Sequence, residues 1–232
     1  MARYHPADLI DHTFRTGHKP SQDEMPPTSG KSVGFKWRAW GHIDKLHPII
    51  TQHKPVLFHL FRRNLLEYAA SRYMSDHIVP ELPEAKEMGF TKFGHSQFKF
   101  KELSGDQQQR LREAMDKVHF SIPVDFATDR IHKMVDAKAL VEKNYLIHLE
   151  NNGAKVYHIC YEDYQSNSKM FMEGFCHSIS VDAGVNLKTQ FKKVSSTKLL
   201  SQVQNLEDLA SNETIESLIK QSEKLIKPRS GI

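Results

Sequence analysis

Two short apolar segments constrain the fold of this chain more than any other feature of its sequence. Residues 55–61 (PVLFHLF) and 154–161 (AKVYHICY) have the length and the β-branched and aromatic content of buried strands. A segment with helical periodicity follows the first, and another follows the second after a polar turn. Strands that alternate with helices form parallel sheets with helices on their faces. We therefore predict an α/β fold, a three-layer parallel sheet with helices on both faces.

The same periodicity predicts the remaining elements. A short strand over 32–37 and a helix over 41–53 precede the first apolar segment, and a polar turn over 162–167 follows the second. Helices are expected over 63–77, 104–118 with Ser104 as N-cap, 125–151 with Gly153 at its C-terminal end, about 168–179, and about 205–226. Pro, Gly, Ser and charged residues concentrate in residues 1–32, which we expect to be loop-rich. We expect residues 33–232 to form a single domain.

The composition limits the kinds of function that we expect for the chain. The chain has 232 residues, of which 39% are hydrophobic and 26% charged, as in an ordinary soluble globular protein. Its net charge of +4 suits anionic ligands, but Lys and Arg form no long run, so we do not expect nucleic-acid binding. The two cysteines form no CxxC pair, which favours a reducing compartment. Without an apolar run of about 18 residues or a signal peptide, we expect a cytoplasmic protein with no membrane segment.

Two further patterns in the sequence do not match a known type of site. Four of the fourteen histidines lie close together in the segment just before Arg62 and Arg63: His42, His47, His53 and His59. No HExxH pattern accompanies them. We therefore predict no metal site and place the histidines at the surface or in a cleft. Residues 30–32 (GKS) resemble the end of a phosphate-binding loop. That motif needs a glycine where Met25 stands, and a helix should follow rather than the strand-like VGFKW.

The carboxyl ends of the two strands carry the candidate site. Arg62 and Arg63 follow the first strand, and Tyr161, Glu162 and Asp163 end the second. Ligands of parallel sheets bind beyond these ends, and a helix N-terminus there offers unpaired N–H groups to an anion. The alternative is that the two arginines only end a strand at the surface. The pattern favours a nucleotide pocket.

These residues resemble the sulfotransferases that use 3′-phosphoadenosine 5′-phosphosulfate (PAPS), particularly bacterial carbohydrate-type members. VLFHLFRRNLLEYAAS is similar to the family's 3′-phosphate motif, an apolar strand, an Arg, and a Ser eight residues later. The resemblance assigns Arg63 and Ser71 to the 3′-phosphate, with Arg62 as the competing arginine, and places Tyr161 beside the adenine. For Glu162 and Asp163 we prefer turn formation and helix capping.

The resemblance implies further site residues. VGFKWRAW is similar to the strand that brings a lysine to the sulfonate, which nominates Lys36. Arg38 stands where relatives can carry a histidine base, so we take His42 as the candidate base. The alternative bases are His5, His12, His18 and His47. FKKVSSTK is similar to a basic segment of the family, so Lys193, with Ser195 and Ser196, either helps to hold the 3′-phosphate or forms a solvated loop.

The resemblance implies a P-loop-nucleotide-hydrolase-like sulfotransferase fold. It implies an enzyme that moves a sulfuryl group from PAPS, as co-substrate, to a hydroxyl acceptor, with carbohydrates as one candidate class and no metal. The family's Gly/Ser/Thr-rich loop for the 5′-phosphosulfate has no good copy here. The alternative function is therefore a catalytically inactive module that binds a nucleotide or another ligand. A homo-oligomer that completes its sheet by exchanging segments is left open.

Overall fold

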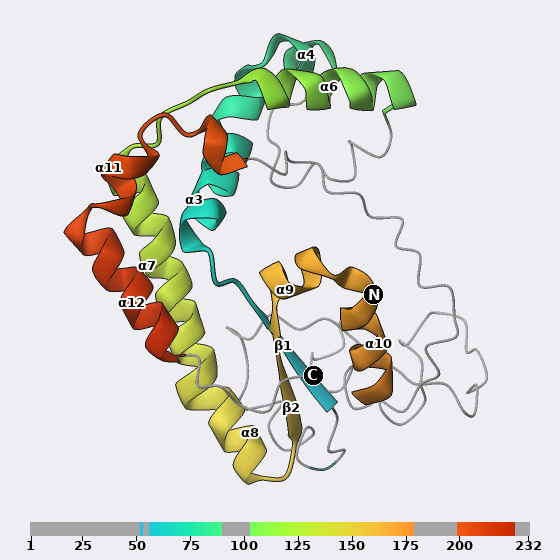
Figure 1. Cartoon of the computed structure of the whole chain (residues 1–232), viewed down its shortest axis with the longest axis vertical. Coiled ribbons are helices and arrows are strands. Elements are labelled where there is room, and N and C mark those ends of the chain that lie inside the picture. Colours follow the sequence, from blue (N-terminus) through green and yellow to red (C-terminus); the bar gives the residue numbers. More distant parts are fainter. Residues whose placement is uncertain (1–51, 53–55, 90–102, 179–198, 226–232) are drawn as a thin grey trace, which may run out of the picture. The chain divides into compact units, whose positions relative to one another are not determined.

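The structure is a computed structural model, and it describes residues 52, 56–89, 103–178 and 199–225 (Figure 1). Within these ranges the chain is mostly helical and contains a small parallel sheet, which agrees with the α/β class. The predicted loop-rich segment over 1–32 and the predicted strand over 32–37 lie outside the described residues.

The sheet of the described residues consists of β1 (Val56–Phe61) and β2 (Lys155–Cys160), the two strands that the apolar segments predict. Side-chain contacts fix their register: the ring of Phe58 stacks on Tyr157 with centroids 5.5 Å apart, and His59 meets His158 edge to face at 5.4 Å. Successive side chains of a strand point to opposite faces. The two aromatic rings therefore cover one face of the sheet, and the two imidazoles lie on the other.

Helix α3 (Leu65–Tyr73) follows β1, as predicted. Asn64 caps it, because its side-chain oxygen accepts a hydrogen bond from the Glu67 N–H at 2.9 Å. The helical path continues through a π-helical turn, η1 (Met74–Ile78), and a 3₁₀ turn, η2 (Val79–Glu81), to the short helix α4 (Pro83–Glu87). The predicted helix over 63–77 is thus confirmed, with its last turn widened.

The next two predicted helices are also present. Helix α6 (Gly105–Lys117) begins with a capping box, in which the Gln107 N–H donates to Ser104 Oγ and the Ser104 N–H donates to Gln107 Oε1. The helix predicted over 125–151 is continuous in path but has three parts: α7 (Val124–Leu140), a π-helical turn η3 (Val141–Leu146), and α8 (Ile147–Asn151). It ends at Gly153, whose φ of +85° is readily adopted only by glycine.

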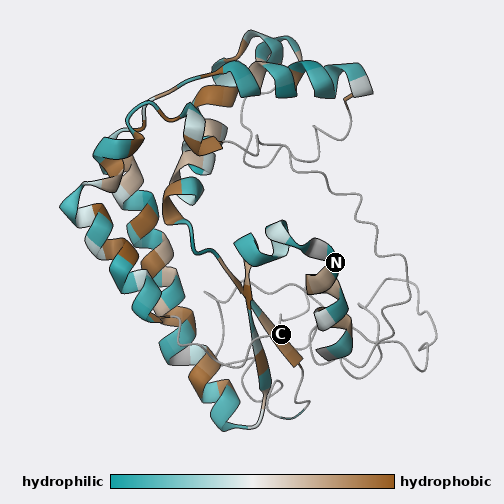
Figure 2. Ribbon diagram, in the orientation of Figure 1, coloured by the Kyte–Doolittle hydropathy of each residue, from teal (hydrophilic) through white to brown (hydrophobic). Residues whose placement is uncertain are grey.

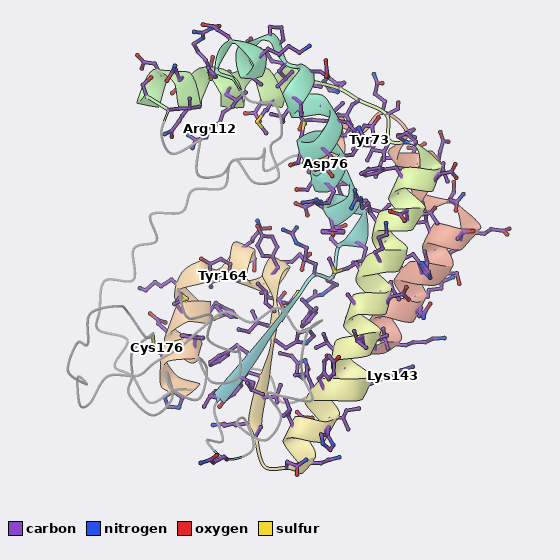
Figure 3. All side chains as sticks on the ribbon, turned by 180° about the vertical axis from the view of Figure 1, so that it is seen from behind. Tyr73, Asp76, Arg112, Lys143, Tyr164 and Cys176 are labelled. Carbon is purple, nitrogen blue, oxygen red and sulfur yellow. The ribbon has the colours of Figure 1, made fainter. Side chains whose placement is uncertain are left out.

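The prediction of a polar turn over 162–167 is wrong, because helix α9 (Tyr161–Ser166) starts directly at the end of β2. Its acidic residues Glu162 and Asp163 stand in the first turn, where negative charge is favourable. Asn167 then accepts a hydrogen bond from the Met170 N–H and separates α9 from α10 (Ser168–Ser178). Tyr164 and Phe171 meet edge to face between the two helices; Figure 3 labels Tyr164 on α9 and Cys176 on α10.

The helix predicted over 205–226 is two helices. A 3₁₀ turn, η4 (Leu199–Gln202), leads into α11 (Leu206–Ala210), and α12 (Glu213–Leu225) follows. Asn212 causes the break, because its side chain caps α12 by accepting from the Ile215 N–H. Apolar and polar residues alternate along α12 with helical spacing (Figure 2).

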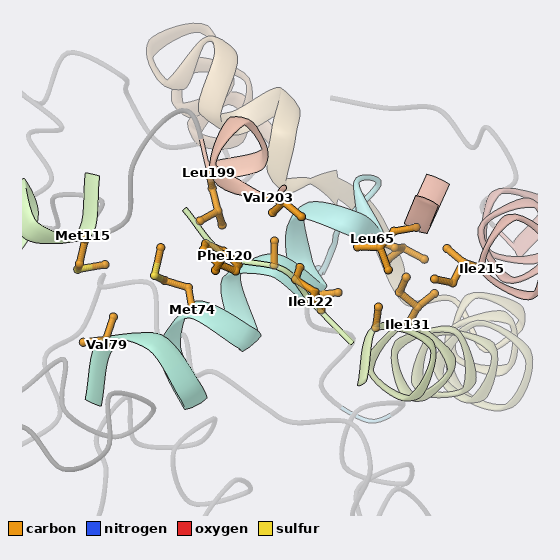
Figure 4. Close-up of a cluster of buried hydrophobic side chains, with 14 of the residues drawn as sticks. Leu65, Met74, Val79, Met115, Phe120, Ile122, Ile131, Leu199, Val203 and Ile215 are labelled. Atoms are coloured by element: carbon orange, nitrogen blue, oxygen red, sulfur yellow. The ribbon is translucent and has the colours of Figure 1, made fainter. Parts of the chain in front are cut away.

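The chain divides into two compact units. The sheet unit includes described residues 56–60 and 137–159, and the helical unit includes the described residues of 61–136 and 160–225. The buried cluster of the helical unit draws on helices α3, α6, α7 and α12, among others, with Leu65, Leu111, Ile131 and Ile215 almost fully buried. Figure 4 shows this cluster. No helix of the described residues has the length and apolar character to cross a membrane.

One buried polar side chain joins separate parts of the helical unit. Gln202 is 3% exposed, and its Nε2 donates to the carbonyl oxygens of Met115, at 2.6 Å, and Val118, at 3.0 Å. Both carbonyls belong to the C-terminal end of α6, where the helix leaves its acceptors without partners. Gln202 therefore fixes the end of α6 to η4.

We expect Gln202→Ala to lower the free energy of unfolding by about 1–3 kcal/mol, because it leaves a buried carbonyl group without a hydrogen bond. Urea denaturation followed by circular dichroism measures the loss. Gln204→Ala is the matched control, because Gln204 is exposed, and it should change stability by less than about 0.5 kcal/mol. Equal transition midpoints for the two variants would contradict the assignment.

Candidate functional site

The candidate site lies where β1 ends and α3 begins, in the helical unit. The backbone N–H groups of Arg63 and Asn64 both point at the carboxylate of Glu162: Arg63 N lies 3.0 Å from Oε2 and Asn64 N lies 2.9 Å from Oε1. These N–H groups belong to the positive end of a helix, which has no internal acceptors for them. Glu162 thus acts as an internal anion at the N-terminus of α3. It is a capping residue, as the sequence suggests, but of a helix about 100 residues away.

The environment of Glu162 keeps it ionised. Burial alone would raise the pKa of its carboxyl, but the Arg63 N–H, the Cys160 thiol and the Asn64 N–H donate to it, and its pKa lies below the ordinary value. Cys160 Sγ lies 3.0 Å from Glu162 Oε2, and burial raises the pKa of this thiol, so it is a neutral donor. Cys160 and Cys176 are both buried and unpaired with each other.

The guanidinium of Arg63 is held at the same place. Its Nη2 donates to both carboxylate oxygens of Asp163, at 3.0 and 2.9 Å, and lies 3.3 Å from Cys160 Sγ. The Arg63 side chain is nevertheless 58% exposed. Among the described residues no acceptor forms a hydrogen bond with its Nε or Nη1. Asp163 therefore orients the guanidinium, and an edge with further N–H donors is left to an anion.

The second arginine approaches an aromatic ring. The guanidinium carbon of Arg62 lies 4.0 Å from the centroid of the Tyr161 ring and 6.0 Å from that of Tyr68. Such contacts are cation–π interactions. The Tyr161 hydroxyl accepts a hydrogen bond from Gln165 Nε2 at 2.9 Å, which fixes the ring on α9. Arg62, Arg63 and Tyr161 are thus brought to one place by the ends of the two strands.

Ser71 lies further along α3. It is seven residues beyond the cap Asn64, about two helical turns, so the two residues share a helix face and are separated by roughly 10 Å along the axis. Ser71 is partly buried. Among the described contacts, the Arg63 side chain reaches Cys160 and Asp163 and does not reach Ser71.

The other predicted site residues are not placed by the structure. Lys36 and His42, predicted to be catalytic, and Lys193, predicted to bind the 3′-phosphate, lie outside the described residues. The same holds for Ser195, Ser196 and the alternative bases His5, His12, His18 and His47.

The sequence analysis missed a second polar cluster, which lies within the sheet unit. His59 on β1, His158 on β2 and Glu142 on η3 are brought together: Glu142 Oε1 lies 3.1 Å from His59 Nδ1 and 3.2 Å from His158 Nδ1. The two Nδ1 atoms are 3.4 Å apart. A signal for the pair was visible, because both strands carry the order aromatic, histidine, aliphatic, as Phe58-His59-Leu60 and Tyr157-His158-Ile159.

This cluster is buried and carries a charge. The side chains of His59, Glu142 and His158 are 14%, 6% and 8% exposed. Burial would raise the pKa of Glu142, but the neighbouring imidazoles of His158 and His59 outweigh it and lower this pKa to about 2. The carboxylate is therefore ionised inside the sheet unit.

Comparison of the chain with protein-family models, with curated proteins and with solved structures found no match.

We expect Glu162→Gln to lower the free energy of unfolding by about 1–3 kcal/mol at pH 7, because an amide replaces one acceptor with a donor that faces the N–H groups of α3. The folded pKa of Glu162 is depressed, so its contribution is complete above the unfolded pKa, near 4.3, and is lost as the pH falls through the folded pKa. Urea denaturation at several pH values should show the difference from wild type shrinking below about pH 4.

Glu173→Gln is the control for this series, because Glu173 is exposed on α10 and its ammonium partner, Lys169, is 4.0 Å away. This variant should match the wild type at every pH within about 0.5 kcal/mol. A stability loss for Glu162→Gln that stays constant down to pH 3 would contradict the role of the ionised carboxylate.

Proposed function

We propose that this chain is a sulfotransferase that moves a sulfuryl group from PAPS to a hydroxyl acceptor, with carbohydrates as one candidate class. The observation that carries the proposal is the oriented guanidinium of Arg63 at the mouth of α3, with Arg62 and Tyr161 beside it. The proposal includes a three-layer P-loop-type sheet, of which β1 and β2 are two strands.

Arg63 has the properties that a 3′-phosphate requires. The carboxylate of Asp163 holds one end of its guanidinium, so little rotamer freedom is lost when a ligand binds. The exposed edge can form charge-assisted hydrogen bonds with phosphate oxygens, which are among the stronger hydrogen bonds in proteins. Ser71, two turns along α3, supplies a hydroxyl on the helix face of Asn64.

Tyr161 and Arg62 suit the base of the nucleotide. The guanidinium carbon of Arg62 lies 4.0 Å from the centroid of the Tyr161 ring, so a cation and an aromatic ring are combined at this point. Aromatic rings and guanidinium planes are common stacking partners of nucleobases. The hydrogen bond from Gln165 holds the Tyr161 ring in position for an adenine.

The transfer step itself needs positioning and charge stabilisation. By analogy with phosphoryl transfer, the acceptor oxygen attacks sulfur in line, the bond from sulfur to the phosphate oxygen breaks, and the acceptor proton goes to a base. We assign Lys36 to the charge on the sulfonate or the leaving oxygen, His42 to the base, and Lys193 to the 3′-phosphate. These roles rest on the resemblance, since the three residues lie outside the described part of the chain.

One observation favours a second candidate, a nucleotide-binding module without turnover. The N–H groups at the start of α3, which an anionic ligand could use, already bind the carboxylate of Glu162. The sequence also offers no good copy of the family's 5′-phosphosulfate loop. In this alternative the nucleotide binds through Arg63, but no sulfuryl group is transferred.

Arg63→Ala should weaken binding of 3′-phosphoadenosine 5′-phosphate (PAP) by about 2–3 kcal/mol, the value of a charge-assisted pair, and leave binding of adenosine monophosphate almost unchanged. Arg63→Lys keeps the positive charge but loses the planar guanidinium with its paired N–H donors. Its affinity for PAP should therefore lie between those of the wild type and Arg63→Ala. Isothermal titration calorimetry measures all three proteins. Arg110→Ala is the matched control, because Arg110 forms an exposed ion pair with Glu87.

If Arg63→Ala lost equal affinity for PAP and for adenosine monophosphate, the assignment of Arg63 to the 3′-phosphate would be wrong. A loss of the same size in Arg110→Ala would do so too, because it would indicate a general effect of charge. Circular dichroism of each variant separates loss of binding from loss of folding.

One variant, Lys36→Ala, distinguishes the proposed enzyme from the inactive module. Lys36→Ala should lower transfer of radiolabelled sulfate from PAPS to a mixture of hydroxyl acceptors by roughly 10²–10³-fold, because it removes a cation from the developing charge. Its affinity for PAP, which lacks the sulfonate, should fall by a much smaller factor than the rate of transfer. PAP binding without detectable transfer by the wild type, across carbohydrate and phenolic acceptors, would favour the module and contradict the enzyme.

A further inference from the structure

The buried cluster of His59, Glu142 and His158 takes no part in the proposed sulfuryl transfer. It lies inside the sheet unit, on the face of the sheet opposite to Phe58 and Tyr157. Glu142 comes from η3, the π-helical turn of the long helix, and such turns often occur at functional sites. Three separate elements, β1, η3 and β2, therefore deliver two imidazoles and one carboxylate to the same point.

The three atoms that face one another form a nearly equilateral triangle. Its sides are 3.4 Å between the two Nδ1 atoms and 3.1 and 3.2 Å from these atoms to Glu142 Oε1. A zinc ion binds histidine nitrogen at about 2.0–2.1 Å and carboxylate oxygen at about 2.0–2.2 Å. In a tetrahedron with such bonds two ligand atoms are roughly 3.3 Å apart. The triangle thus has the dimensions of one face of a zinc coordination shell.

Two buried polar atoms of the cluster lack a well-aligned hydrogen bond. Glu142 Oε1 is buried, and in the described part of the chain it has no well-aligned hydrogen bond, although both Nδ1 atoms are near. The Nε2 atom of His158 is also buried there without a hydrogen-bond partner. A metal cation between the three side chains would compensate the charge of this buried carboxylate.

We propose that this chain binds a zinc ion in the sheet unit, with His59 Nδ1, His158 Nδ1 and Glu142 Oε1 as its protein ligands. Imidazole nitrogen and carboxylate oxygen are ligands that suit zinc. Two neutral imidazoles and one carboxylate leave a net charge of +1 on the bound ion. The remaining coordination position is open to a water molecule or another small ligand.

The consequence is a cross-link between β1, β2 and the helix that precedes β2. Zinc that binds the folded chain and not the unfolded chain stabilises the folded state in proportion to the logarithm of its free concentration. The ion would hold together a sheet that, among the described residues, has only two strands. This stabilising effect is independent of whether the chain transfers sulfate.

The test uses the full chain, dialysed against a chelator and then against metal-free buffer. Zinc chloride is titrated in competition with a chromophoric chelator, and the melting temperature is followed as zinc is added. We expect one ion per chain and a melting temperature that rises with zinc concentration. Cobalt(II) is a second probe of the wild type, because tetrahedral cobalt with nitrogen and oxygen ligands absorbs visible light strongly, whereas the hexaaquo ion hardly does.

Variants of Glu142 and His158 test whether the zinc ion binds at this cluster. Glu142→Gln keeps the shape of the side chain and should weaken zinc binding at least tenfold, as should His158→Ala. His132→Ala is the matched control, since this histidine lies exposed on α7 beside Asp136, and it should bind zinc like the wild type. Circular dichroism checks that each variant is folded.

Three outcomes would overturn the proposal. The wild type could show no stoichiometric zinc, with neither a rise in melting temperature nor a visible cobalt spectrum. Folded Glu142→Gln and His158→Ala could bind zinc as tightly as the wild type, which would place the ion at other residues. Glu142→Gln could be destabilised equally with and without zinc, which would make the cluster a hydrogen-bonded triad only.

Discussion

A single carboxylate connects the two strand ends on which the rest of the candidate site depends. Glu162 lies in the first turn of α9, directly after β2, and accepts hydrogen bonds from the backbone N–H groups of Arg63 and Asn64, which lead from β1 into α3. The carboxyl ends of parallel strands meet at one sheet edge, so this contact is available only when β1 and β2 are neighbours. It also keeps Asp163 within reach of Arg63. Capping of the helix and orientation of the arginine are therefore consequences of the same local geometry.

This arrangement decides how an anion can bind. The dipole of α3 is already compensated by Glu162, so it contributes little to a second negative charge. The guanidinium of Arg63 is shared with Asp163 through one nitrogen only, and its exposed edge is the stronger remaining anion donor of the described site. Selectivity for a 3′-phosphate would then come from the direction of this edge relative to Tyr161. Pairing with Asp163 lowers the entropy that Arg63 loses on binding, at the expense of some of its net charge.

The two strands and most helices could be predicted from the sequence, because their signals are local: apolar runs, the N-cap Ser104 and the terminal Gly153. Helix α9 was missed because acidic residues after a strand signal a turn as well as a helix start. The contacts of Glu162 and the His59–Glu142–His158 cluster join residues up to 99 positions apart, and no local pattern shows which of the chain's polar residues will meet. Only the repeated aromatic-histidine-aliphatic order in the two strands hinted at the pair of imidazoles.

Calorimetric titration of the wild-type chain with PAP, compared with adenosine diphosphate, tests the central claim most directly. Both ligands are adenosines with two phosphates, but PAP carries one at the 5′ and one at the 3′ position, whereas adenosine diphosphate carries both at the 5′ position and lacks the 3′-phosphate that Arg63 is proposed to hold. The account predicts that PAP binds at least tenfold more tightly than adenosine diphosphate, which corresponds to about 1.4 kcal/mol or more. Equal affinities, or no binding of PAP, would contradict it and leave Arg63 as a structural partner of Asp163.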